Sequence, residues 1–318
     1  MSSTITHNQT NNTFLTVPEL AQLLHVNEKK IYQLAGEGDL PGTKITGKWI
    51  FPRHLIEDWI AENSHGGALT DRLIVTGSDD RLLNHVCNQM AVDHQQSALF
   101  SYSPCGTRHG LRMLDTRRAD ACFINWGAAD NSARRHLGLM RTYKNHGSWI
   151  IVRCFQRTQG FILSRQCAEK NPAIKQYLET KQPLDIKLLL QDSSLQWAHR
   201  SSDAGATRFL EDACTTQNHS YADLNLSYIC NTERSAAGAV STGDADITCG
   251  TQAAAHEFQL PFIPVADVSL DMVMTRRTYF RSLTQLFFNT LTNDNTRAIA
   301  MRMGGYNLHA KLDVLAAD

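Results

Sequence analysis

Apolar residues near the start of the chain recur three and four positions apart, the spacing that predicts short amphipathic helices. One predicted helix follows the cap residue Thr16, a second spans residues 28–35, and a third spans residues 52–60. Between the last two, residues 44–51 place Thr46 and Gly47 between two short β-prone runs and predict a small β-hairpin, the wing. The pattern therefore predicts one compact unit over residues 13–63.

The pattern changes after a polar, glycine-containing stretch that we interpret as a linker over residues 64–71. From residue 72 to residue 318, short β-rich runs alternate with helical segments, which is typical of an α/β domain with a largely parallel sheet. The predicted strands are 72–76, 98–103, 121–125, 148–154, 160–164, 246–249, 262–265 and 269–274. The predicted helices are 80–93, 110–116, 172–179, 206–215, 233–242 and 279–291. Residues 1–12 are polar, and we expect them to be a disordered tail.

The composition narrows the class of protein. The 318 residues carry 31 Lys and Arg against 31 Asp and Glu, so a nucleic-acid partner requires a local basic patch. No apolar run approaches the ~18 residues of a membrane span, and the polar N-terminus lacks the pattern of a secretory signal. The eight cysteines have neither zinc-site nor redox-motif spacing, and we interpret them as reduced core residues. We therefore expect a cytoplasmic protein without a membrane partner.

Four segments of the first unit, at residues 14–24, 26–32, 38–41 and 47–49, together resemble the excisionase-type, MerR-like winged helix-turn-helix family. In such units the second helix enters the major groove of DNA. The resemblance implies DNA contacts from Lys29, Lys30, Tyr32 and Gln33, and phosphate contacts from Lys44, Lys48 and Arg53. Because the unit is not basic overall, we expect one copy to bind weakly, and a homodimer or higher homo-oligomer to bind a double-stranded operator. The alternative is a protein-interaction module with solvated lysines.

Three predicted strand-to-helix junctions, at residues 76–79, 101–107 and 200–208, combine hydroxyl side chains with glycine. The N–H groups and the dipole at a helix start favour anions, and glycine lets a ligand approach the backbone. An ordinary N-cap has the same composition, so one such junction is uninformative. Three within one α/β domain predict a ligand crevice at the carboxyl ends of the strands.

Segments at 77–80, 157–161, 200–208, 235–246, 260–264 and 304–306 resemble, in their order, the periplasmic-binding-protein-like domain of bacterial regulators. That family is similar to type 2 solute-binding proteins, including those for molybdate and tungstate. The resemblance implies an α/β fold with two lobes (the second at about 160–265), two crossing strands and a ligand between the lobes. The implied ligand-binding residues are Ser78, Ser103, Gly106, Thr107, Arg157, Gln159, Arg200, Ser201, Ser202 and Thr207. Arg157 could equally be a salt-bridge partner, and Arg200 and Arg208 could pair with Asp203, Glu211 or Asp212.

Catalytic signatures are missing from the sequence. Residues 255–258 lack the second histidine of a zincin, no Gly-x-Ser-x-Gly elbow occurs, and the thirteen histidines form no tight metal-binding pair. We therefore expect no enzyme, no catalytic residue, no metal site and no cofactor apart from a small oxyanion ligand. The leading hypothesis is a ligand-responsive one-component transcriptional regulator, with molybdate or tungstate as the first-choice ligand. The alternative is a cytoplasmic ligand-binding or cofactor-insertion accessory protein whose first unit binds a protein.

Overall fold

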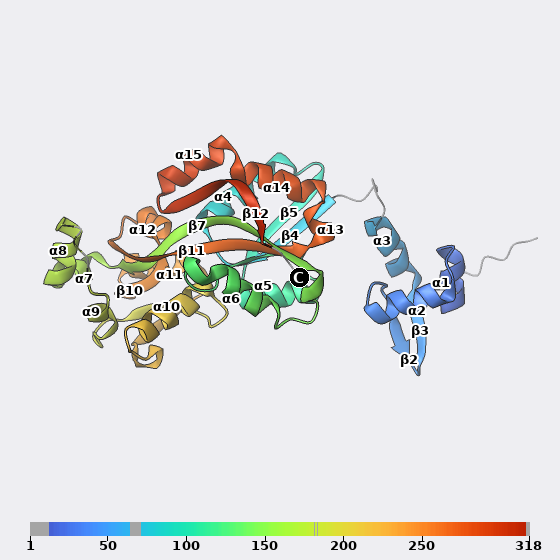
Figure 1. Ribbon diagram of the computed structural model, residues 1–318, viewed down its shortest axis with the longest axis horizontal. Helices are drawn as coiled ribbons and strands as arrows, with labels where there is room; N and C mark the ends of the chain where they lie inside the picture. The colour runs from blue at the N-terminus through green and yellow to red at the C-terminus, as the bar shows by residue number, and fades with distance from the viewer. Residues whose placement is uncertain (1–12, 64–70, 181, 183, 316–318) are drawn as a thin grey trace, which may run out of the picture. The chain divides into compact units, whose positions relative to one another are not determined.

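The computed structural model describes residues 13–63, 71–180, 182 and 184–315 (Figure 1). The chain divides into two compact units between Thr70 and Asp71. We call residues 13–63 unit 1 and residues 71–315 unit 2. The predicted tail over 1–12 and the predicted linker, except for Asp71, lie outside the described residues.

Unit 1, within its described residues, has three helices and a three-stranded sheet in the order β1-β3-β2. The elements are β1 (Phe14–Leu15), α1 (Val17–Leu23), α2 (Glu28–Glu37), β2 (Thr43–Ile45), β3 (Lys48–Pro52) and α3 (Arg53–Asn63). Thr16 caps α1 together with Glu19, and the Asn27 side chain caps α2. Thr46 and Gly47 both have positive φ, as the tight turn of the hairpin requires. The predicted helices and hairpin are confirmed.

One hydrophobic core holds unit 1 together. It joins residues of β1 and β3 to the inner faces of all three helices, and its fully buried members include Leu20, Ile31, Phe51 and Ile56. The pairing of β1 with β3 closes this core at its edge. A two-residue strand has no periodicity of its own, so β1 was not predicted from the sequence.

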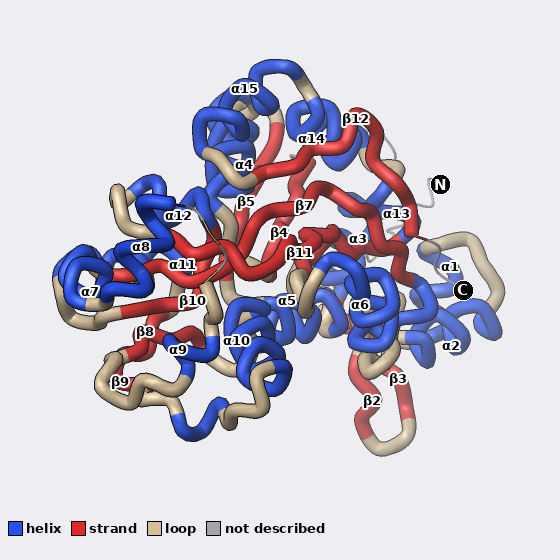
Figure 2. The backbone as a smooth tube through the Cα atoms, turned by 60° about the vertical axis from the view of Figure 1, so that its left-hand side comes forward, coloured by secondary structure: helices blue, strands red, loops and turns tan. Residues whose placement is uncertain are grey.

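Unit 2, over its described residues, contains a nine-stranded sheet in the order β5-β4-β6-β11-β7-β10-β8-β9, with β12 paired to β7 (Figure 2). The strands are β4 (Asp71–Gly77), β5 (Ala98–Pro104), β6 (Ala121–Ile124), β7 (Trp149–Leu163), β8 (Trp197–Arg200), β9 (Leu226–Cys230), β10 (Ile247–Thr251), β11 (Phe262–Thr275) and β12 (Tyr306–Leu315). The first five α-helices are α4 (Arg81–Asp93), α5 (Thr107–Asp115), α6 (Ser132–Met140), α7 (Arg165–Lys170) and α8 (Pro172–Thr180). The others are α9 (Lys187–Leu190), α10 (Gly205–Thr216), α11 (Glu233–Thr242), α12 (Gln252–Glu257), α13 (Arg276–Tyr279), α14 (Ser282–Thr292) and α15 (Asp294–Met303).

Two long strands, β7 and β11, run through both lobes of unit 2. The first lobe contains β4, β5, β6 and β12, and the second lobe contains β8, β9 and β10. The two long strands pair antiparallel from Trp149 opposite Thr275 to Ile162 opposite Phe262. The prediction of separate strands at 148–154 and 160–164, and at 262–265 and 269–274, is therefore wrong. The intervening residues look polar in sequence, but in the structure Arg157 is buried and remains within the ladder.

The direction of the strands differs between the lobes and the crossing. Strands pair in parallel within β5-β4-β6 and within β10-β8-β9. They pair antiparallel wherever β7 or β11 takes part. The sheet is therefore mixed, and the prediction of a largely parallel sheet is wrong at its centre.

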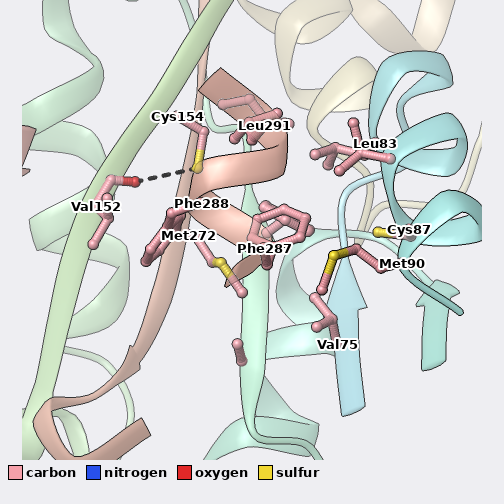
Figure 3. Close-up of a cluster of buried hydrophobic side chains, with 14 of the residues drawn as sticks. Val75, Leu83, Cys87, Met90, Val152, Cys154, Met272, Phe287, Phe288 and Leu291 are labelled. Atoms are coloured by element: carbon pink, nitrogen blue, oxygen red, sulfur yellow. Dashed lines mark hydrogen bonds between the residues drawn. The ribbon is translucent and has the colours of Figure 1, made fainter. Parts of the chain in front are cut away.

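Each lobe has its own core. In the first lobe, Phe287 and Phe288 of α14 pack with Met272 of β11 and Met90 of α4 (Figure 3). In the second lobe, residues of β7, β8, β10, α9 and α10 surround Trp197. All eight cysteines are free, and all except half-buried Cys105 are buried. None of the described helices combines the length and apolar character needed to cross a bilayer.

Candidate functional site

The two lobes meet where α5 of the first lobe and α10 of the second lobe begin. The cap residues, Gly106 and Ala204, make no side-chain hydrogen bond to their helices. A Cβ added at Gly106 would lie 3.0 Å from the carbonyl oxygen of Asp203 and 3.4 Å from the nitrogen of Ala204. A Cβ at Gly205 would lie 2.2 Å from the carbonyl oxygen of Asn125. Two helix N-termini, one from each lobe, therefore meet at this boundary, and their dipoles favour an anion.

An ion pair joins the lobes beside these helix starts. Both terminal nitrogens of Arg112 on α5 donate to the Asp203 carboxylate, at 3.2 and 2.5 Å. The Arg108 N–H donates to the carbonyl oxygen of Asp203 at 3.1 Å. The hydrogen bond from Arg112 holds the pKa of Asp203 below its usual value. Because the Arg112 side chain is 49% exposed, solvent screens the pair, and we expect it to contribute at most ~1 kcal/mol to stability.

A second contact between the lobes is a cluster of five buried charged side chains, Asp79, Asp80, Arg157, Arg200 and Glu233. Arg157 Nη1 donates to the Asp80 carboxylate at 2.6 Å and to the Asp79 carbonyl oxygen at 3.0 Å. The Asp79 carboxylate accepts from the backbone N–H of Glu233 at 2.7 Å and lies 4.0 Å from Arg200 Nη1. A carboxylate of the first lobe thus sits at the N-terminus of α11 in the second lobe.

Burial and like charges shift the ionisation of this cluster. Desolvation, with Asp79 and Asp80 nearby, raises the pKa of Glu233 to about 7, although Arg157 and Arg200 oppose the shift. Burial alone would lower the pKa of Arg157, but the carboxylates of Glu233 and Asp80 outweigh it and raise that pKa. The guanidinium therefore stays charged, while Glu233 can gain or lose a proton near neutral pH.

Three buried polar atoms close to the boundary lack a hydrogen-bond partner among the described residues. They are the Nε atoms of Arg157 and Arg200 and the Oδ1 atom of Asn125. Buried polar atoms in native proteins are nearly always paired, so each such atom requires an explanation. Two of the three belong to guanidinium groups, which suit an anionic ligand.

The structure brings most of the predicted ligand-binding residues to this boundary. Ser78 and Thr107 are buried and share a hydrogen bond of 2.7 Å between their hydroxyls. The Thr207 hydroxyl donates to the carbonyl oxygen of Arg200 at 2.9 Å, and Gln159 Nε2 donates to the Cys249 sulfur at 3.4 Å. These side chains fix the strand-to-helix junctions in place.

The remaining predicted ligand-binding residues are exposed. Ser201 and Ser202 lie just before the start of α10. Ser103 lies on β5, the strand at the edge of the sheet, and is exposed there. Arg208 forms the predicted ion pairs with Glu211, at 3.4 Å, and Asp212, at 2.6 Å.

Sequence reasoning missed the acidic half of the buried cluster. Asp79 and Asp80 lie in the segment 77–80 at the first strand-to-helix junction, but the sequence analysis assigns neither of them to the ligand site. Glu233 is only the first residue of a predicted helix there. The two adjacent aspartates directly after a buried strand were the available signal. Glu233 offered none, because it lies 154 positions from its partner Asp79. The described residues contain no group of three His, Cys, Asp or Glu side chains arranged to hold a metal ion.

In unit 1, the predicted DNA-contacting residues of α2 are all exposed, and Tyr32 is 53% exposed. Lys30 Nζ donates to Gln33 Oε1 at 3.2 Å, and Gln33 Nε2 donates to Glu37 Oε1 at 3.0 Å. A DNA-bound α2 would therefore exchange these contacts for contacts to DNA. The same helix also presents Lys29 on its exposed surface.

The predicted phosphate-contacting residues of unit 1 lie on the hairpin and at the start of α3. Lys44 on β2 and Lys48 on β3 are exposed. Arg53 lies 3.7 Å from the Glu57 carboxylate one turn along α3, an exposed pair of the kind that contributes little to stability. Their contacts with DNA phosphates stay a prediction.

Two sequence families account for most of the chain. Residues 14–64 match a helix-turn-helix domain, and residues 89–292 match the PBP superfamily domain. The second match spans more than half of the chain, so the protein belongs to the periplasmic-binding-protein (PBP) superfamily. It is a binding-protein fold joined to an N-terminal helix-turn-helix domain.

Two of the solved structures with similar folds have a TM-score above 0.5. One is a phosphate-bound substrate-binding protein assigned to phosphate ABC transport in Clostridium perfringens, with a TM-score of 0.52 and 10% identity, covering 75% of this chain and 100% of that chain. Another is an OxyR variant from Corynebacterium glutamicum bound to H2O2, with a TM-score of 0.51 and 14% identity, covering 93% of each chain. At these identities the likeness establishes the fold alone. No curated protein matches the sequence significantly.

Proposed function

We propose that this protein is a one-component transcriptional regulator that binds operator DNA through unit 1 and a small oxyanion between the lobes of unit 2. The combination of a helix-turn-helix domain with a ligand-binding fold supports a ligand-responsive DNA-binding role. A binding role rather than catalysis fits the phosphate-bound substrate-binding protein among its structural neighbours. Such a regulator would act in the cytoplasm, where its DNA is.

The single observation that carries the ligand assignment is the meeting of two helix N-termini without side-chain caps, at Gly106 and Ala204. By contrast, α4 and α11 begin with side-chain caps, Asp80 and Thr232. A compact oxyanion takes hydrogen bonds from several backbone N–H groups at once, and nearby guanidinium groups add charge. We keep molybdate and tungstate as the first choices, and the phosphate bound to the Clostridium perfringens protein makes phosphate the next to test.

The ligand would act on the contacts between the lobes. An anion at the N-termini of α5 and α10 would compete with the Asp203 carboxylate for Arg112. Its negative charge would also interact with the charged side chains of the buried cluster between the lobes. A ligand that interacts differently with two arrangements of the lobes shifts the balance between them. That shift is the step that would change operator binding.

Calorimetry with molybdate, tungstate, sulfate and phosphate tests the oxyanion assignment. We expect wild type to bind one or more of the four, and Ser202→Ala, next to the start of α10, to bind more weakly. Ser227→Ala, at an exposed position on the edge strand β9, is the matched control and should bind as wild type does. If none of the four anions binds, the oxyanion assignment fails. If Ser227→Ala loses affinity and Ser202→Ala does not, the placement of the site fails.

Binding of the full chain to its own upstream DNA tests the regulator assignment. We expect preference over random duplex DNA and a loss of binding in a Lys29→Ala/Lys30→Ala variant. The rival function is a cytoplasmic ligand-binding or cofactor-insertion protein whose unit 1 binds a protein. Equal binding to specific and random DNA, unchanged in the double variant, would favour that rival.

A further inference from the structure

Strand β5 forms one edge of the sheet in unit 2, and no described strand pairs with its outer side. It pairs in parallel with β4 over its whole length, from Ala98 opposite Asp71 to Pro104 opposite Gly77, without a register shift. The strand at the opposite edge, β9, is shorter, and its pairing with β8 contains a register shift. A long and regular edge is a template for another strand, so β5 is the stronger candidate of the two.

One face of β5 is exposed as well as its edge. Phe100 and Tyr102 belong to the first-lobe core. The residues that alternate with them, Leu99, Ser101 and Ser103, are exposed, and Leu99 is 53% exposed. Helix α5 packs on the neighbouring strands β4 and β6. The strand therefore combines a buried inner face with an accessible outer face and an accessible edge.

The sequence of β5 lacks the features that keep edge strands apart. Residues 97–103 contain no charged side chain and no proline, and Pro104 comes only at the end of the strand. Natural edge strands are commonly protected by charges, prolines or bulges. The absence of charge also favours one occupant, because two copies of an uncharged strand meet without like-charge repulsion.

We propose that two copies of this chain associate by antiparallel pairing of their β5 strands about a two-fold axis at Ser101. In that register Ser101 lies opposite the same residue of the second copy, and Leu99 lies opposite Ser103 of the second copy. The contact is the same on both copies, so it closes as a dimer. The proposal rests on the regulator proposed above, and it names the contact of the homodimer that the sequence leads us to expect.

The pairing would be weak in free solution and stronger on DNA. A strand of seven residues spans about 23 Å, and its pairing alone buries less than the ~1,600 Å² of a standard interface. Two helix-turn-helix units held on adjacent half-sites raise the effective concentration of the two β5 edges.

The dimer contact also lies close to the proposed ligand site. The Tyr102 hydroxyl of β5 donates to the carbonyl oxygen of Ser78, and Gly106, the cap of α5, lies two residues after the end of the strand. In the proposed dimer, only a few residues would therefore separate the helix start from the dimer contact.

Sedimentation equilibrium of the full chain tests the proposal. We expect wild type to move from monomer to dimer as protein concentration rises. Leu99→Lys should shift this association at least tenfold to higher concentration, because a lysine on an edge strand opposes pairing with another strand. The side chain at position 99 is already exposed, so the fold should accept the change. Ile229→Lys, the same kind of change at an exposed residue of the other edge strand, β9, is the matched control and should dimerise as wild type does. A wild type that stays monomeric at the highest concentration reached, a Leu99→Lys variant that dimerises over the same range as wild type, or an Ile229→Lys variant that dimerises more weakly would each overturn the proposal.

A charge-swap experiment tests the register. Ser101→Lys and Ser101→Glu should each be monomeric, because each places like charges opposite each other at the two-fold axis. An equal mixture of the two variants should recover the dimer, since opposite charges then face each other. Failure of the mixture to dimerise would overturn pairing about Ser101.

The two proposals fail independently. A chain that binds its operator and an oxyanion but stays monomeric retains the regulator function and loses the β5 contact. A chain that dimerises through β5 but binds neither DNA nor any of the four anions retains the contact and loses the proposed function.

Discussion

The Asp79 carboxylate connects the two lobes at the level of a single residue. It accepts the backbone N–H of Glu233 at 2.7 Å and a hydrogen bond from Asn84 Nδ2 at 3.0 Å, and it faces Arg200. A carboxylate at a helix N-terminus is stabilised both by the hydrogen bond and by the helix dipole. One side chain of the first lobe therefore satisfies the start of a helix in the second.

We expect Asp79→Ala to destabilise unit 2 by about 1–3 kcal/mol, because it leaves the buried N–H of Glu233 without its acceptor and the buried Arg200 without the carboxylate that it faces. Urea unfolding monitored by tryptophan fluorescence measures the change. Asp223→Ala, at an exposed position, is the control and should change stability by less than ~0.5 kcal/mol. Equal effects of the two changes would contradict the role of Asp79.

Glu233 makes the stability of unit 2 depend on pH in an unusual direction. Its pKa is raised from 4.5 to about 7 in the folded protein, so the folded state holds this proton more tightly than the unfolded chain. The contribution of Glu233 to the free energy of unfolding therefore falls as pH rises from about 4.5 to about 7.

We expect Glu233→Gln to flatten the pH dependence of the unfolding free energy in this window. Its neighbours Arg157, Arg200, Asp79 and Asp80 remain in the variant, so only the titration at position 233 is removed. Asp203, whose pKa is lowered, contributes stability that is lost only at more acidic pH, below the window. Parallel curves for wild type and Glu233→Gln, from urea unfolding at a series of pH values, would contradict this assignment.

At the level of elements, the two crossing strands β7 and β11 join the two lobes of unit 2. Gly160 of β7 lies opposite Gly250 of β10 and Pro264 of β11, where the second lobe joins the crossing. A Cβ at this position would lie 2.0 Å from the carbonyl oxygen of Ile263. The close approach of the backbones is possible only because the residue is glycine.

We expect Gly160→Ala to cost more than ~2 kcal/mol of stability, since the new methyl group forces the two crossing strands apart. Gly138→Ala in α6 is the matched control, because nothing lies within 4 Å of its added Cβ. That change should stabilise the protein by about 0.5–1 kcal/mol through helix propensity. Thermal unfolding of the two variants measures the expected loss of stability in the first and the expected gain in the second. A Gly160→Ala variant as stable as wild type would contradict the close approach of β7 and β11.

For the whole molecule, the proposed operator binding would depend on the number of copies that bind together. Unit 1 has few basic residues, so each contact of a lysine with a phosphate contributes visibly to the salt dependence of binding. A dimer on two half-sites makes every such contact twice.

We expect Lys48→Ala to reduce the slope of log Kobs against log salt by about 2, one for each copy in the dimer, because Lys48 is one of the predicted phosphate contacts. Fluorescence anisotropy with labelled operator DNA over a series of salt concentrations measures the slope. Lys170→Ala, at an exposed position in unit 2, is the control and should leave it unchanged. A reduction of about 1 would indicate that a single copy contacts the DNA.

The sequence by itself determined the local structure of this protein. Caps such as Thr16 and Asn27, the turn at Thr46 and Gly47, and the apolar spacing of α1, α2 and α3 act over a few residues, so their pattern is visible in the chain. The resemblance to known families predicted the two lobes and the expected place of a ligand between them. These features need no knowledge of which distant segments meet.

Only the tertiary structure decided which strands are continuous and which charges meet. The polar residues of β7 remain in the ladder because the partner strand and the second lobe bury them. Arg157 pairs with Asp80 across 77 positions, and Asp79 reaches Glu233 across 154. Such contacts depend on the fold as a whole. The net strength of a buried ion pair is set by the cost of removing both charges from water and by the geometry in which they meet, and the local sequence records neither.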